Sequence, residues 1–154
     1  MTGSRTPVVV DGGILVGHDG SPASSEALAW AAGHAARLGV PLHVLRAWSM
    51  TNAPRPETMA PGYVPPIEDF EAAVLRQLTH DVEVLHLPAE CDGRLHAVRG
   101  QSAAKLLEAA QGAEIVVVGA RGAGGFRGLM FGSTADQVMR HAPCPVVVVP
   151  VGRD

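Results

Sequence analysis

The sequence has a single lysine, two cysteines and few aromatic residues, and these shortages narrow what the protein can be. Fifteen acidic residues outweigh twelve basic ones, giving a net charge of −3 and no electrostatic basis for binding nucleic acid. Cys91 and Cys144 form no C-x-x-C pair, which favours a reducing cytoplasm, although a regulatory disulfide stays an open alternative. No apolar run approaches the roughly 20 residues of a membrane span. The composition therefore predicts a cytoplasmic protein that is not embedded in a membrane.

The length of 154 residues is typical of one domain with a single hydrophobic core. Residues 1–12 have no apolar stretch long enough for a secretory signal, and we expect them to be a flexible tail. A single domain is expected over residues 13–151.

Short apolar runs alternate with segments of helical period along this domain. The expected strands are residues 14–17, 42–48, 95–99, 115–118 and 146–149. The expected helices begin at Ser21, Ile67, Ser102 and Ser133. Five prolines within residues 49–66 predict a long surface loop, of a kind that often covers a site. The alternation predicts an α/β fold, a three-layer sandwich with a five-stranded, mostly parallel sheet.

Several helix ends carry recognisable local signals. Ser21 and Ser102 are predicted N-caps, and Ser133 with Asp136 has the S-x-x-D form of a capping box. In the first helix, apolar residues at helical spacing up to Leu38 predict the buried face.

A glycine-rich segment between the fourth strand and the last helix has the layout of a phosphate-binding loop. Gly119 and Gly122 are followed, after nine intervening residues, by Gly132 and then by Ser133 and Thr134. Glycine lets backbone N–H groups approach an anion, and a helix N-terminus adds unpaired donors and a positive dipole end. The segment therefore predicts a phosphate site.

The best-known phosphate motifs do not fit this segment. A Walker A loop needs a lysine beside its glycines, and the single lysine, Lys105, lies far from them. The dinucleotide motif G-x-G-x-x-G also fails, because Gly122 and Gly124 are followed by Arg127 instead of a third glycine. No zinc spacing or nucleophile motif appears, so the sequence assigns no catalytic and no metal-binding residue.

The pattern that remains resembles the nucleotide-binding branch of the universal stress protein family. Its motif, Gly-x-x-Gly, nine residues and Gly-Ser/Thr, is matched by residues 119–133. The likeness extends from Ile14 to Pro150 and includes the segments 16–21 and 141–149. The resemblance implies a Rossmann-like fold of the adenine nucleotide alpha hydrolase-like type.

The resemblance also implies an ATP site. The phosphates would lie on the loop from Gly119 to Thr134, the ribose near Gly119, and the adenine between the first two strands. Asp19 would meet the base, Ala47 would face the adenine through its backbone, and Arg121 stands within reach of a phosphate. The binding residues implied are Asp19, Ala47, Val118, Gly119, Arg121, Gly122, Gly132, Ser133 and Thr134. Two alternatives stay open: magnesium could accompany ATP, and AMP or a cyclic nucleotide could bind in place of ATP.

Structural roles compete with ligand roles at several of these positions. Asp19 is also typical of a residue that braces the start of a helix, and Arg121 of a solvated charge. For His18 a surface histidine is favoured over contact with the ligand, and for Trp48 a core position is favoured over a stacking platform.

The function favoured is a nucleotide-responsive stress or regulatory protein with at most slow ATP hydrolysis. A slow ATP hydrolase or phosphotransfer enzyme is one alternative, and a dimeric interaction module that binds no nucleotide is another. The four valines of residues 146–149 predict an apolar edge strand, and hence a homodimer formed through it.

Overall fold

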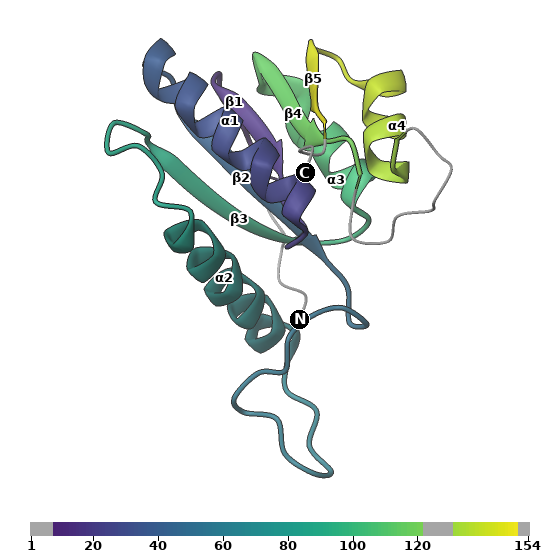
Figure 1. The fold of residues 1–154 in the computed structure, drawn as a ribbon. Coiled ribbons are helices and arrows are strands. Elements are labelled where there is room, and N and C mark those ends of the chain that lie inside the picture. Colours follow the sequence, from purple (N-terminus) through teal and green to yellow (C-terminus); the bar gives the residue numbers. More distant parts are fainter. Residues whose placement is uncertain (1–7, 122–130, 151–154) are drawn as a thin grey trace.

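The computed structural model describes residues 8–121 and 131–150, which form a layered α/β fold (Figure 1). Its strands are β1 (Ile14–Gly17), β2 (Leu42–Trp48), β3 (Gly93–Arg99), β4 (Ile115–Gly119) and β5 (Val146–Val149). They form a five-stranded sheet in the order β3-β2-β1-β4-β5, with every neighbouring pair parallel. The predicted α/β sandwich with a five-stranded sheet is confirmed.

Helices cover both faces of the sheet (Figure 1). The helices are α1 (Pro22–Leu38), α2 (Ile67–Val84), α3 (Ser102–Ala109), extended by the 3₁₀ turn η1 (Ala110–Gly112), and α4 (Ser133–His141). One apolar layer joins α1 and α2 to the sheet around Leu28 and Leu78. The other joins α3 and α4 to it around Leu106 and Val138. No helix among residues 8–121 and 131–150 is long and apolar enough to cross a bilayer.

The central strand β1 shows why the strands are continuous apolar runs. Leu15 packs into the α3 and α4 layer, whereas its neighbour Val16 packs into the α1 and α2 layer. A strand covered on both faces by helices needs apolar side chains at successive positions, without polar alternation.

The ends of α1 match the sequence prediction, but its last apolar residue does not. The Ser21 hydroxyl accepts the Ser24 N–H at 3.2 Å, and Gly39 ends the helix in the left-handed conformation with φ +68°. Leu38, predicted on the buried face, is 63% exposed. At 3.6 residues per turn, Leu38 lies only about 20° around the helix axis from the buried Ala27 and Ala31, on the predicted face. Its burial was wrongly predicted because Leu38 is the last residue of α1, at the helix end before Gly39.

Two glycines of the α1 segment provide a matched test of this local account. Gly39→Ala is expected to lower the free energy of unfolding by about 1 kcal/mol, since an L side chain resists the left-handed conformation. Gly33→Ala is expected to raise it by about 1 kcal/mol, because Gly33 is helical and open space surrounds its Cβ position. Urea unfolding of both variants measures the difference. Equal effects of the two substitutions would contradict the account.

The segment before β1 is packed where the structure describes it. Val10 is only 3% exposed and belongs to the α3 and α4 layer. The Gly12 N–H donates to the Gly112 carbonyl at 2.8 Å, which fastens the segment to η1. Residues 8–12, expected to belong to a flexible tail, thus make core and backbone contacts, while residues 1–7 lie outside the described part.

The loop of residues 49–66 leads from β2 to α2, as predicted (Figure 1). Its Ala53 and Met59 pack against a small apolar cluster formed by Trp48, Phe70 and Val74. Trp48 is 1% exposed, which confirms the prediction that it is a core residue.

Candidate functional site

A cleft opens at the carboxyl ends of β1 and β4, the adjacent central strands of the sheet. After β1 the chain continues into α1 on one face, and after β4 it leads to α4 on the other. The helices α1 and α4 therefore lie on opposite faces of the sheet, with a crevice at the strand ends between them. The space is open to solvent. Its lining residues are Gly17, His18, Asp19, Ser24, Ser102, Leu106, Val118, Gly119, Arg121, Thr134 and Ala135.

The structure brings together five of the nine binding residues implied by the sequence. Those that line the cleft are Asp19, Val118, Gly119, Arg121 and Thr134. Gly132 and Ser133 directly precede Thr134 without lining the cleft, and Gly122 lies outside the described residues. The loop of residues 49–66 contributes no lining residue. Sequence reasoning did not assign Gly17, Ser24, Ser102, Leu106 and Ala135 to the site.

Ala47, expected to face the adenine through its backbone, does not line the cleft. It is partly buried and packs in the α3 and α4 layer, the layer that also contains Leu45. Since side chains alternate along a strand, Ala47 and Leu45 share one face of β2. The described geometry therefore gives Ala47 a packing contact.

The first turn of α4 points its N-terminal end toward the cleft, because Thr134 and Ala135 line it. The predicted capping box is wrong: Gly132 is the N-cap, and no side chain makes a cap hydrogen bond there. Asp136 instead pairs with Arg140 across 3.1 Å, and the Ser133 hydroxyl accepts from Gln137 at 3.1 Å. Ser133 is the first helical residue, one position after the N-cap, so its side chain is not placed to cap the helix. The α4 N-terminus thus keeps its positive dipole end without a side-chain cap.

The helix α3 shows the same displacement by one residue. Its N-cap is Gln101, which makes no side-chain cap hydrogen bond, and Ser102 is the first helical residue. The prediction of Ser102 as the cap was wrong, but the residue lines the cleft instead. Two uncapped helix starts therefore border the same space.

Gly119, at the end of β4, has a structural reason to be glycine. A Cβ atom built there would lie 2.9 Å from the Ala23 carbonyl oxygen of α1. Backbone cannot yield as a flexible side chain can, so the close approach of α1 to β4 requires glycine. This requirement is separate from any role in holding a phosphate.

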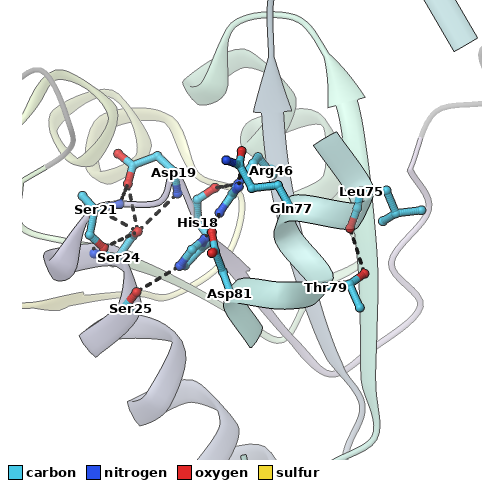
Figure 2. A network of polar contacts seen from close by, with 10 residues as sticks. All are labelled: His18, Asp19, Ser21, Ser24, Ser25, Arg46, Leu75, Gln77, Thr79 and Asp81. Carbon is cyan, nitrogen blue, oxygen red and sulfur yellow. Dashed lines mark hydrogen bonds and ion pairs between the residues drawn. The ribbon is translucent and has the colours of Figure 1, made fainter. Parts of the chain in front are cut away.

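Asp19 follows β1 and is tied to the start of α1 (Figure 2). Its Oδ1 accepts the Ser21 N–H at 2.8 Å and the Ser24 hydroxyl at 2.8 Å. The bracing role, left open by the sequence, is therefore present in the structure. Asp19 also lines the cleft, so the same bonds fix a carboxylate at its rim.

The neighbouring His18 is buried at 4% exposure, although the favoured expectation was a surface histidine. It contacts Arg46 of β2, whose Nη2 donates to the His18 Nδ1 and whose Nε donates to the His18 carbonyl at 3.3 Å. A guanidinium has donors only, so Nδ1 must accept and the ring proton sits on Nε2. Nε2 then donates to the Ser25 hydroxyl at 3.1 Å.

Burial and the Arg46 charge lower the pKa of His18 to about 4, against the opposing effect of Asp81 and Asp19. The histidine is therefore neutral at pH 7. Arg46 itself is balanced by Asp81 of α2, with 2.8 Å between Nη2 and Oδ2 (Figure 2). The sequence signal for this cluster was a lone charge inside the apolar strand of residues 42–48.

No group of three or more histidine, cysteine or acidic side chains that could hold a metal ion occurs within residues 8–121 and 131–150. The cleft instead offers backbone at the ends of β1 and β4, hydroxyls from Ser102 and Thr134, and charged groups from Asp19 and Arg121. These groups suit a polar ligand that carries an anionic part.

A parallel sheet of this order, with a cleft at its central strand ends, defines a Rossmann-like α/β protein. The model of the universal stress protein family matches residues 13–150. The chain therefore belongs to the universal stress protein family.

Curated relatives share about a third of their residues with this chain. A universal stress protein of Mycolicibacterium smegmatis is 35% identical over 153 residues, covering 95% of this chain and 46% of the relative. Universal stress protein Rv1996 of Mycobacterium tuberculosis is 36% identical over 150 residues, covering 92% and 44%. The chain thus spans less than half the length of these relatives.

Solved structures share the fold. A universal stress protein crystallised in complex with cAMP is 25% identical, with a TM-score of 0.63. The similarity covers 94% of this chain and 99% of that protein.

Proposed function

We propose that the protein binds an adenine nucleotide, with ATP as the expected ligand, and acts as a nucleotide-responsive regulatory protein of the stress response. The observation that carries the proposal is the cleft itself, where the starts of α3 and α4 meet the ends of β1 and β4. Helix N-termini without side-chain caps attract phosphate through their N–H groups and dipoles. The likeness to a universal stress protein that binds cAMP supports an adenine ligand.

Within this proposal, the phosphates lie against Thr134 and the α4 start, and Arg121 supplies a positive charge at the same end. The base lies toward Asp19, whose position is fixed by Ser21 and Ser24. Gly122, Gly132 and Ser133 complete the phosphate loop in the sequence motif. Magnesium would accompany ATP, while AMP or a cyclic nucleotide would bind without the need for it.

We further propose that the protein holds its nucleotide and at most hydrolyses it slowly. Phosphoryl transfer needs a residue that positions water and a carboxylate for the metal. Asp136 is paired with Arg140, and Asp19 is engaged by Ser21 and Ser24. Steady release of phosphate from ATP, lost in Asp19→Ala, would instead favour the enzyme.

Identification of a co-purified ligand tests the nucleotide directly. Protein purified without added nucleotide is denatured, and the released small molecules are identified by chromatography and mass spectrometry. We expect an adenine nucleotide, and a rise in Tm when ATP is added to stripped protein. Absence of both would favour the interaction module that binds no nucleotide.

A homodimer in the cytoplasm, formed through β5, is part of the same proposal. Among the described residues, β5 pairs with β4 alone and lies at the edge of the sheet. Its four valines remain half-buried, so both an apolar surface and backbone groups are open to a second strand. Sedimentation is expected to give a dimer at micromolar concentration. A monomer under those conditions would contradict the dimer.

A further inference from the structure

Arg46 is a charged side chain buried between β2 and α2, and its contacts lead to the rim of the cleft (Figure 2). We infer that Arg46 is a positioning residue for the nucleotide site: it clamps His18, and through it the loop that carries Asp19, to helix α2. The inference rests on the proposed function and adds a link from the site to α2.

The clamp fixes His18 at several points. The His18 N–H donates to the Leu45 carbonyl at 3.0 Å, and the His18 carbonyl accepts from Arg46 Nε at 3.3 Å. Its ring is held between Arg46 on one nitrogen and Ser25 of α1 on the other. Because both the backbone and the side chain of His18 are bound, the position and orientation of the next residue, Asp19, are restricted.

The other end of the clamp lies on α2. Arg46 forms an ion pair with Asp81 at 2.8 Å and donates to Gln77 at 3.4 Å. The Arg46 side chain is 7% exposed and that of Asp81 is 31% exposed, so the pair runs from the interior to the surface. A buried guanidinium needs such partners, because an unpaired charge in the interior is strongly unfavourable. Any displacement of α2 would therefore disturb the partner on which Arg46 depends.

The charges around His18 explain why arginine serves this role. Arg46 faces the ring from β2, Asp81 from α2 and Asp19 from the loop itself, while α1 contributes the neutral Ser25. With Arg46 present, the ring stays neutral and its Nδ1 accepts. Without Arg46, the two carboxylates favour the protonated ring, which no longer has an acceptor nitrogen.

Hydrogen exchange of the ligand-free protein tests the clamp independently of nucleotide. In Arg46→Met, the amide protons of residues 18–21 are expected to exchange at least tenfold faster than in the parent protein. The matched control is Arg94→Met, which removes an exposed arginine of the adjacent strand β3. That arginine pairs with Asp92, just before the strand. Exchange in the control is expected to stay within twofold. If Arg46→Met does not fold, Asp81→Asn weakens the same clamp from its exposed end.

Affinity and titration complete the experiment. By calorimetry, Arg46→Met is expected to bind ATP at least tenfold more weakly, with partial recovery in Arg46→Lys. By NMR, the pKa of His18 is expected to rise in Arg46→Met but not in Arg94→Met, because the Arg46 charge lies against the ring.

Unchanged exchange at residues 18–21 would overturn the clamp. Faster exchange with unchanged ATP affinity would overturn the positioning role. If the parent protein binds no adenine nucleotide, the proposed function fails and with it the positioning role, while the exchange result still decides the clamp.

Discussion

Thr134→Asp is expected to abolish ATP binding while leaving the protein folded. Thr134 lies in the first turn of α4 and lines the cleft. A carboxylate there repels the ATP phosphates, and two unit charges 4 Å apart interact by about 4 kcal/mol at an effective dielectric constant of 20. Affinity should fall at least 100-fold. The helix itself gains about 0.3 to 1 kcal/mol, since acidic residues are favourable at a helix N-terminus.

The matched control is Thr134→Asn, which has the shape of aspartate without its charge. Calorimetric titration with ATP should show at most a tenfold loss for this variant. In urea unfolding, the free energy of unfolding of both variants should lie within about 1 kcal/mol of that of the parent protein. Retained ATP binding in Thr134→Asp would mean that the phosphates do not lie at the α4 start.

Acid is expected to destabilise the fold through His18 well above the pH at which His18 itself titrates. The pKa of His18 falls from 6.5 in the unfolded chain to about 4 in the fold. Between these values the unfolded chain binds a proton that the folded chain does not, so the free energy of unfolding decreases as the pH falls. The effect is absent above pH 6.5 and complete below about 4. It reaches at most about 3 kcal/mol, at 1.36 kcal/mol per pKa unit.

His18→Asn isolates this contribution, because the asparagine oxygen can still accept from Arg46 but does not titrate. Burial also lowers the pKa values of His43 and His96, which act in the same direction in both proteins. The test is therefore the difference between the two proteins in urea unfolding at pH 7 and pH 4.5. The same acid-induced loss in both would contradict the neutral, buried state of His18.

The strands and helices were predictable because their signals are local. β1 and β5 are short apolar runs between glycine, proline and polar residues, and Ser21 with Gly39 marks both ends of α1. N-cap positions were less predictable, because the backbone conformation before a helix decides which residue is the cap and which is the first helical residue. Ser102 and Ser133 each proved to be the first helical residue, although serine is equally typical of the cap.

The candidate site was predictable on its β4 side and only partly on its β1 side. The glycine spacing pointed to Gly119 and Thr134 because a backbone cradle has a sequence signature. The clamp has no such spacing. Arg46 stands out as a lone charge in an apolar strand, but its partner Asp81 is 35 positions away, and only the packing of α2 on β2 brings the two together. The side chain of Ala47 packs in the α3 and α4 layer, and the role of its backbone toward an adenine stays a prediction.

Isothermal titration calorimetry of the stripped protein with ATP measures nucleotide binding itself. We expect saturable binding with one nucleotide per chain, and the loss of that binding in Thr134→Asp. Absence of saturable binding of ATP, AMP and cAMP at concentrations up to about 1 mM, where even weak sites of about −4 kcal/mol are half-filled, would contradict the proposed nucleotide binding.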